Sequence, residues 1–264
     1  MAEMALITLI LPYYNEAGFI AATLASLAGQ ADRRFRLVLV DNASSDGSEQ
    51  IARNACAAMP DISVSFLREP QPGKIHALRA GMAAATTDYV GTVDADTIYP
   101  PDYVKQALAI FARDPSASCA LAFGLGPKAG RPMQLARLRL YARLFPRKCH
   151  TGGYGQNFRR DLLDQAGGFG IGIWPYVLED HEIVHRMQKL GPILYGAGFF
   201  CLPSDRRDNR SRCSWSLAER IIYKLLPTVF MDWFFYRFLG PRMAQRGLGN
   251  LRLRERGWDS EDAA

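Results

Sequence analysis

The sequence predicts an α/β fold in which a Rossmann-like, largely parallel sheet is flanked by helices and followed by a C-terminal helical appendage. In the N-terminal part of the chain, short apolar runs of strand type alternate with segments of helical periodicity. Strands that alternate with helices pair in parallel, because each helix carries the chain back to the starting edge of the sheet. With 264 residues, the chain is long enough for one large domain with a sizeable core.

The expected elements follow one another in a regular order. Apolar runs predict strands at residues 6–11, 36–40, 62–67, 89–93, 117–123 and 193–200. Helical patterns occupy residues 17–28, 48–59, 75–85, 103–111, 135–145 and 178–190. The helix at 135–145 is basic and amphipathic. We therefore assign residues 1–213 to a main domain, and residues 214–264 to an amphipathic helical appendage with a charged tail.

Composition favours a cytoplasmic protein and leaves its partners open. The five cysteines are scattered and never form a Cys-X-X-Cys pair, which argues against a disulfide framework and against a zinc ribbon. The first residues carry no export signal. A formal net charge of +6 permits an anionic substrate, an anionic membrane or nucleic acid. Because RNA-binding signatures are absent, we expect no nucleic-acid partner.

Three of the predicted strands run into polar residues. These polar ends are residues 12–16, residues 41–47 and the Asp94-Ala95-Asp96 segment. Ligands of open α/β sheets bind beyond the carboxyl ends of the strands, so we expect the three ends to converge on one site. Asp94 and Asp96 are two residues apart on a strand, so both carboxylates can reach a single cation. Ser44, Ser45 and Asp46 serve equally well as turn formers and helix caps.

The absence of two common nucleotide-binding motifs narrows the classes of ligand that the site can bind. No Gly-X-Gly-X-X-Gly follows the first strand, and Gly73-Lys74 lacks the rest of a P-loop. An acidic site repels a diphosphate unless a hard divalent cation bridges the two, and Mg²⁺ or Mn²⁺ suits carboxylate and phosphate oxygens. Asp41 is a candidate acceptor of hydrogen bonds from a base or ribose. Lys74 either supplies positive charge to the nucleotide or is a solvated residue at a helix start.

Taken together, the motifs resemble the inverting family 2 glycosyltransferases of the GT-A fold. The resemblance rests on residues 9–16, 40–47, 93–96 and 167–169, on Gly73-Lys74 with Ala77-Leu78, and on Glu179-Asp180, so it spans about residues 6–215. It implies that residues 1–213 form a catalytic domain that uses a nucleoside diphosphate-sugar donor. It further implies that Asp96 holds the metal and that Asp180 is the general base. The implied nucleotide contacts are Pro12, Tyr14, Glu16, Asp41, Lys74 and Asp94.

The residues expected on the acceptor side match the family less closely, and the sequence departs from the family motifs at two places. Residues 152–157 resemble the acceptor loop of the family, which makes Gly153, Asn157 and Glu179 candidate acceptor contacts. Arg79 stands where many relatives carry Asn. In place of the Gln-X-X-Arg-Trp signature of processive members the chain has only Arg-Cys-Ser-Trp at 212–215, so we do not expect processive synthesis. Candidates for neutralising the diphosphate are Arg207, Arg210 and Arg212.

Two alternative functions remain from the residues alone. His181-Glu182-X-X-His185 fits the signature of zinc metalloproteases, although no Gly-X-X-His continuation follows. Glu179 and Asp180 also suit the first turn of an ordinary helix, where the helix dipole favours carboxylates. A non-catalytic membrane adaptor built on a transferase fold is the second alternative. A complete acidic site argues against it.

The appendage predicts peripheral contact with a membrane. Residues 221–239 are apolar and aromatic, but charged residues and a proline interrupt them, so the segment is too polar to cross a bilayer. Lys224, Arg237 and Arg242 suit anionic head groups. We expect docking on the inner face of the cell membrane and a glycan or lipid-linked acceptor. The alternative is that these side chains complete the core or form a dimer contact.

Overall fold

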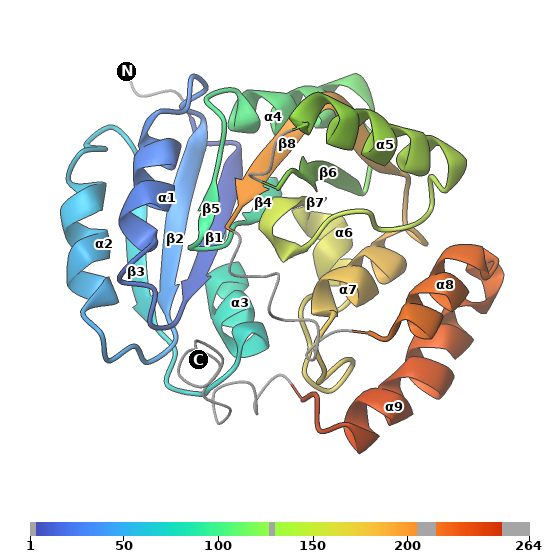
Figure 1. Ribbon diagram of the computed structural model, residues 1–264. Helices are drawn as coiled ribbons and strands as arrows, with labels where there is room; N and C mark the ends of the chain where they lie inside the picture. The colour runs from blue at the N-terminus through green and yellow to red at the C-terminus, as the bar shows by residue number, and fades with distance from the viewer. Residues whose placement is uncertain (1–3, 127–129, 205–214, 250–264) are drawn as a thin grey trace.

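The computed structural model describes residues 4–126, 130–204 and 215–249. Eight strands form one sheet in the order β3-β2-β1-β4-β7-β6-β8-β5 (Figure 1). The strands are β1 (Ile7–Tyr13), β2 (Phe35–Asp41), β3 (Val64–Arg68), β4 (Tyr89–Thr92), β5 (Thr97–Ile98), β6 (Cys119–Gly124), β7 (Gln156–Arg159) and β8 (Ile193–Pro203). Strands β3, β2, β1 and β4 run parallel to one another, and β6 is parallel to β8. The predicted α/β fold with a mostly parallel sheet is therefore confirmed.

Strands β5 and β7 were not predicted. Strand β7 lies between β4 and β6 and is antiparallel to both, and β5 is antiparallel to β8. Both are short: β5 has two residues, and β7 has the sequence Gln-Asn-Phe-Arg with a single apolar residue. The other strands were predicted from apolar runs, and neither of these two strands contains one.

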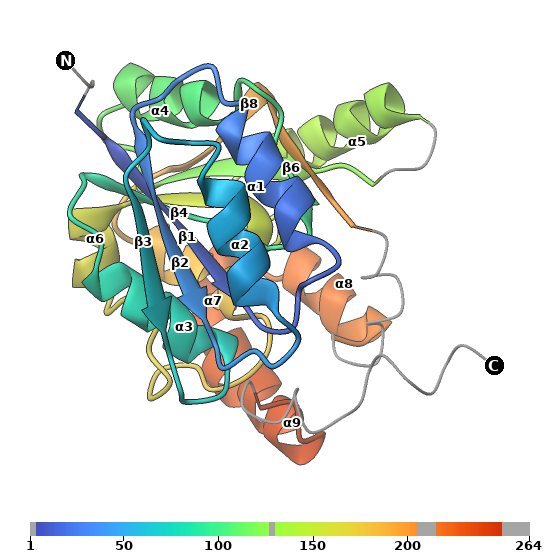
Figure 2. The same ribbon diagram turned by 90° about the vertical axis from the view of Figure 1, so that its left-hand side faces the viewer.

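Helices cover both faces of the sheet. They are α1 (Ile20–Ala28), α2 (Ser48–Cys56), α3 (Lys74–Ala83), α4 (Tyr103–Arg113), α5 (Arg131–Leu144), α6 (Arg160–Gln165) and α7 (Glu179–Met187). Figure 2 shows α1 and α2 on one side of the parallel strands, and α3 and α6 on the other. Strand β1 contributes to both layers, because successive side chains of a strand point to opposite faces. Leu9 and Leu11 pack with α1 and α2, whereas Ile10 packs with α3 and α7.

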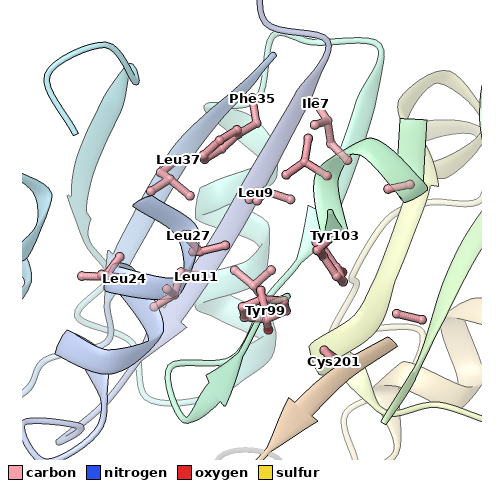
Figure 3. Close-up of a cluster of buried hydrophobic side chains, with 14 of the residues drawn as sticks. Ile7, Leu9, Leu11, Leu24, Leu27, Phe35, Leu37, Tyr99, Tyr103 and Cys201 are labelled. Carbon is pink, nitrogen blue, oxygen red and sulfur yellow. The ribbon is translucent and has the colours of Figure 1, made fainter. Parts of the chain in front are cut away.

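Figure 3 shows the larger of the two apolar layers. Leu9 and Leu11 of β1 meet Leu24 and Leu27 of α1, and all four side chains have no exposed surface. Removing a fully buried leucine side chain typically costs about 2–5 kcal/mol of stability. This packing fixes β1 and so the loop at its carboxyl end, which is the loop that carries the first predicted motif.

The C-terminal appendage is partly core and partly exposed. It consists of α8 (Leu217–Leu225), a short turn η3 (Thr228–Phe230), the π-helix η4 (Trp233–Leu239) and α9 (Gly240–Gln245). Phe234 and Phe235 are fully buried and pack with Trp174 and Val177 of the preceding chain. In the part of the chain that the structure describes, no helix is both long enough and apolar enough to span a membrane.

Candidate active site

The loops after β1 and β2 are bound to each other by hydrogen bonds. Sheet register places Tyr13 opposite Asp41, so the two strands end side by side. The backbone nitrogens of Asn15 and Glu16 donate to the hydroxyls of Ser44 and Ser48, at 3.1 and 2.8 Å. The two loops therefore lie side by side at the carboxyl ends of β1 and β2. Pro12 and Glu16 are partly buried there, and Tyr14 is exposed.

Two residues in these loops adopt a left-handed backbone conformation. Asn15 has φ 51° and Ala43 has φ 63°. Few non-glycine residues adopt positive φ, and such residues cluster where the surrounding structure fixes a functional loop. Each of the two loops therefore contains a turn that the surrounding structure imposes.

Asp41 and Asn42 connect β2 to the start of α3. The buried Asp41 carboxylate accepts a hydrogen bond of 2.8 Å from the backbone nitrogen of Ser44 and lies 3.9 Å from the Arg68 guanidinium. The Asn42 side chain donates to the carbonyls of Glu69 and Gln71, and accepts from the nitrogen of Gly73. Asn42 thereby holds the loop that begins α3.

Lys74 bridges two groups of carboxylates. Its Nζ lies 2.8 Å from Oδ1 of Asp94 and 3.8 Å from Oε1 of Glu179. Asp94 follows β4, and Glu179 begins α7, so one lysine joins the donor motif to the predicted base motif. A β-carbon at Gly153 would lie 3.0 Å from Nζ, so a glycine leaves room for the lysine.

Asp94 is held by a residue that follows β5, and Asp96 by a residue that follows β8. The nitrogen of Asp94 donates to the hydroxyl of Tyr99 at 2.9 Å, and the hydroxyl of Ser204 donates to Oδ2 of Asp96 at 2.9 Å. Both aspartates are over nine-tenths buried. Hard carboxylate oxygens fit Mg²⁺ or Mn²⁺, with phosphate oxygens and water as the remaining ligands. Among the described residues, no three His, Cys, Asp or Glu side chains are grouped to hold a metal.

Asp180 is held from three directions. The backbone nitrogen of Gly153 donates to its Oδ2 at 2.9 Å. The backbone nitrogen and Nδ1 of His181 both donate to its Oδ1, at 2.8 and 2.9 Å. Burial alone would raise the pKa of this carboxyl, but the charge and hydrogen bonds of His181 outweigh burial and leave the pKa lowered. Asp180 is therefore ionised at neutral pH.

The pKa of Glu179 is shifted in the opposite direction to that of Asp180. Burial raises its pKa to about 7, the charge of Asp180 adds to the rise, and Lys74 opposes it. Leu178, which precedes both carboxylates, has φ 67° and so makes a left-handed turn into α7. Two adjacent carboxyls with pKa values shifted in opposite directions indicate a functional site.

The structure does not bring Asn157 to the surface of this site. Its side chain is fully buried in β7, where it donates to the hydroxyl of Tyr103 and to the carbonyl of Ala120. Gly153 and Glu179, the other two candidate acceptor contacts, do lie beside Asp180 and Lys74. The diphosphate candidates Arg207, Arg210 and Arg212 fall outside the described residues.

The structure disfavours the zinc-protease alternative. Glu182 is buried, and Arg186 and the hydroxyl of Tyr236 bind its carboxylate. His185 is also buried and bonds Asp232 of the appendage at 2.8 Å. The glutamate of a metalloprotease must act on a metal-bound water, whereas this one is neutralised by an ion pair. The motif instead joins α7 to the C-terminal helices.

Sequence reasoning gave no role in the transferase site to four residues that organise it: Asn42, Tyr99, Ser204 and His181, the last of which was considered only within the zinc-protease signature. Asn42 lies inside a quoted motif, and His181 follows the predicted base, so position alone could have drawn attention to them. Ser204 gave no such signal, because it meets Asp96 only where the end of β8 pairs with β5. Tyr99 is close to Asp94 in sequence, but its hydroxyl reaches the Asp94 nitrogen only through the turn that the chain makes after β4.

Comparison with protein families decides the classification. The model of glycosyl transferase family 2 matches residues 8–169. The chain belongs to glycosyl transferase family 2. The family 2 chain resembles an undecaprenyl-phosphate 4-deoxy-4-formamido-L-arabinose transferase of Aeromonas hydrophila, with 30% identity over 107 residues. That match covers 39% of this chain and 33% of the relative, so the chain spans about a third of the length of the curated relatives it matches.

Solved structures confirm the GT-A fold of this family 2 glycosyltransferase. The mannosyltransferase PcManGT from Pyrobaculum calidifontis, in complex with GDP-Man and Mn²⁺, superimposes with a TM-score of 0.70 at 23% identity, over 93% of this chain and 70% of that one. The S. aureus TarS fragment 1–349 with UDP gives 0.62 at 19% identity, over 90% and 72%. At these identities the likeness establishes the fold alone.

Proposed function

We propose that this family 2 glycosyltransferase moves a sugar from a nucleoside diphosphate to an acceptor hydroxyl, with inversion at the anomeric carbon and with Mg²⁺ or Mn²⁺. One observation carries the proposal. Asp180 is kept ionised by His181 and follows Glu179, while Asp94 and Glu179 both pair with the half-buried Lys74. A proton acceptor and a donor-binding edge therefore lie on either side of Lys74.

On the donor side, the chain's residues bind and neutralise a nucleotide. Asp41 and Asp94 lie at the ends of β2 and β4, the two strands that flank β1, and accept hydrogen bonds from the base or ribose. Pro12, Tyr14 and Glu16, at the end of β1, lie between them. Asp96 would hold the divalent cation. When bound, this cation compensates the negative charge that develops on the leaving diphosphate.

On the acceptor side, Asp180 acts as the general base. An acceptor hydroxyl is a poor nucleophile until a carboxylate removes its proton during attack on the anomeric carbon. Both carboxylate oxygens keep lone pairs beyond the three hydrogen bonds that they accept. Gly153 orients the carboxylate through its backbone nitrogen, and Glu179 lies beside it as an acceptor contact.

Turnover with a panel of UDP-, GDP- and dTDP-sugars tests this proposal. We expect one donor class to release nucleoside diphosphate, by transfer or by slow hydrolysis, in the presence of Mn²⁺. The absence of release with every donor would favour the non-catalytic adaptor.

The transfer product should carry the anomeric configuration opposite to that of the donor. A single base and one displacement invert the attacked carbon, whereas two displacements would retain its configuration. The anomeric proton coupling in the NMR spectrum of the product distinguishes the two. Retention would refute the single-displacement mechanism.

The His181→Ala variant should lose activity at acidic pH. His181 lowers the pKa of Asp180, so removing its side chain raises that pKa, and the base becomes protonated as the pH falls through the raised value. We expect the acid limb of the kcat profile to move to higher pH, so that the ratio of kcat at about pH 5 to kcat at neutral pH falls several-fold.

His181→Asn provides the matched control, because its amide can still donate to Asp180. It should retain more of the activity at acidic pH. An acid limb that is unchanged in His181→Ala would show that His181 does not set the ionisation of the base.

For the acceptor, we propose a lipid-linked or membrane-proximal glycan. Support comes from the curated relatives named as undecaprenyl-phosphate transferases. The protein would then work peripherally at the inner face of the cell membrane.

A further inference from the structure

Large apolar side chains lie exposed on α8 and on the segment that follows it. Their exposed fractions range from 48% to 78%, and the residues are Leu217, Ile221, Leu225, Val229, Phe230 and Trp233. Leu217, Ile221 and Leu225 recur every four residues, so they share one face of α8. The opposite face holds Tyr223, which is buried in the core of the appendage. The exposed residues are therefore not needed to complete the core.

Helix α5 presents a second apolar stripe. Met133, Leu140 and Leu144 are 78%, 53% and 60% exposed. They are separated by seven and four residues, which places them on one face of a helix with 3.6 residues per turn. No residue of α5 is buried, so the helix does not contribute to the core. Figure 2 shows α5 standing apart from the helices that cover the sheet.

The two helices approach each other. The Lys224 ammonium of α8 lies 5.0 Å from the ring centroid of Tyr141 in α5. This distance suits a cation–π contact. Figure 1 shows α5 and α8 at the same side of the molecule. The exposed apolar residues of α5, α8 and the segment up to Trp233 together make up what we call the two-helix surface.

The two-helix surface is strongly basic. Residues 131–147 contain five exposed arginines and no acidic residue. On α8, Glu219 is buried and bound by Arg242 and Arg246, whereas Arg220 and Lys224 are exposed. Apolar side chains surrounded by exposed cations are the pattern of a protein surface that lies on an anionic membrane.

We propose that the two-helix surface docks the protein on an anionic lipid membrane. A second copy of the chain is a poorer occupant, because two identical basic faces repel each other when they meet across a two-fold axis. A nucleic acid would use the cations but would leave the leucine and valine side chains in water. Only a lipid interface satisfies both the apolar stripe and its charge.

This docking surface deepens the proposed function, on which its catalytic meaning rests. The hydroxyl of Tyr223, on the inner face of α8, accepts a hydrogen bond from the nitrogen of Cys149, and its ring lies 5.7 Å from that of His181. His181 in turn binds Asp180. One layer of side chains thus separates the proposed base from α8. When α8 lies on the membrane, the base is close to the lipid, where an anchored acceptor can reach it.

Flotation with lipid vesicles tests the docking surface without any need for catalysis. The full chain should bind vesicles of phosphatidylglycerol and phosphatidylcholine at low salt, bind weakly to phosphatidylcholine alone, and lose binding as salt is added. Arg137→Gln combined with Arg143→Gln should weaken binding to the anionic vesicles roughly 25-fold. Lys105→Gln with Arg113→Gln on α4 removes the same charge elsewhere and should have little effect.

A second variant tests the apolar part. Leu217→Ser, Leu225→Ser and Val229→Ser together should weaken binding at least about tenfold, because each loses apolar surface that would enter the interface. Met4→Ser, at an equally exposed apolar side chain far from α8, is the control. The arginine variant lies on α5, so it still tests the surface if the triple variant does not fold.

The outcomes separate the docking surface from the proposed function. An Asp180→Asn protein should float like the wild type, since binding does not need the base. A wild-type protein that stays unbound at low salt would overturn the docking surface, and so would variants that bind as well as their controls. Binding by a protein that is inactive with every donor would support the surface and contradict the proposed function.

Discussion

Asp180→Asn should lower kcat about 1,000-fold while donor binding stays the same. An amide cannot take a proton from the acceptor hydroxyl, and general bases commonly contribute about 10²–10⁴-fold to the rate. Asparagine is nearly isosteric with aspartate and can still accept hydrogen bonds through its carbonyl oxygen from Gly153 or His181. The loss should therefore appear in the chemical step.

Single-turnover kinetics and calorimetry with the donor measure the two quantities separately. Glu179→Gln is the control, because it removes the neighbouring carboxylate and leaves Asp180 in place. We expect it to raise the acceptor KM and to lower kcat far less than Asp180→Asn. A fully active Asp180→Asn would show that another group accepts the proton, and Glu179, with its pKa of about 7, would be the first candidate.

Asp96→Ala should abolish turnover mainly by weakening metal-dependent binding of the nucleoside diphosphate. The variant removes a buried hard oxygen ligand, and without the cation the remaining carboxylates repel the diphosphate. We expect kcat/KM to fall at least about 1,000-fold, with a matching loss of Mn²⁺-dependent affinity.

Ser204→Ala is the graded control for this prediction. It removes the hydrogen bond to Oδ2 of Asp96 but keeps the carboxylate, and groups that orient a metal ligand typically contribute about 10–100-fold. Calorimetry with the nucleoside diphosphate and Mn²⁺ should rank the wild type above Ser204→Ala, and Ser204→Ala above Asp96→Ala. Equal affinity of the wild type and Asp96→Ala would refute the metal assignment.

The regular alternation of strand and helix patterns made most of the sheet predictable. Prediction failed where a strand is defined by contacts with residues far away in the chain. Strands β1 to β4 coincide with apolar runs in the sequence, and the helices between them show clear helical periodicity. Strand β7 has four residues, of which Gln156 and Asn157 are buried amides. The place of Asn157 inside the sheet depends on contacts to Tyr103 and Ala120. A motif match made Asn157 a candidate acceptor contact. The structure buries it instead, because a local pattern does not show which side chains of a segment point into the core.

In the candidate site, too, local sequence patterns were predictable and long-range contacts were not. The three strand-end motifs converge because parallel strands end at one edge, which the sequence pattern implies directly. The bridge from Lys74 to Glu179 could not be read from the chain, since it joins α3 to α7 across about a hundred residues. Burial raises the pKa of Glu179, and His181 lowers that of Asp180 against the effect of burial; only the folded arrangement sets both.

The left-handed turns at Asn15, Ala43 and Leu178 imply a trade-off between stability and activity. A side chain in this conformation costs about 1–2 kcal/mol relative to the right-handed form, with asparagine at the lower end. Isolated peptides of these loops would relax to other shapes, so the site geometry is imposed by the rest of the fold. A donor that binds only the imposed shape stabilises the whole protein by mass action, and its presence should therefore raise the melting temperature.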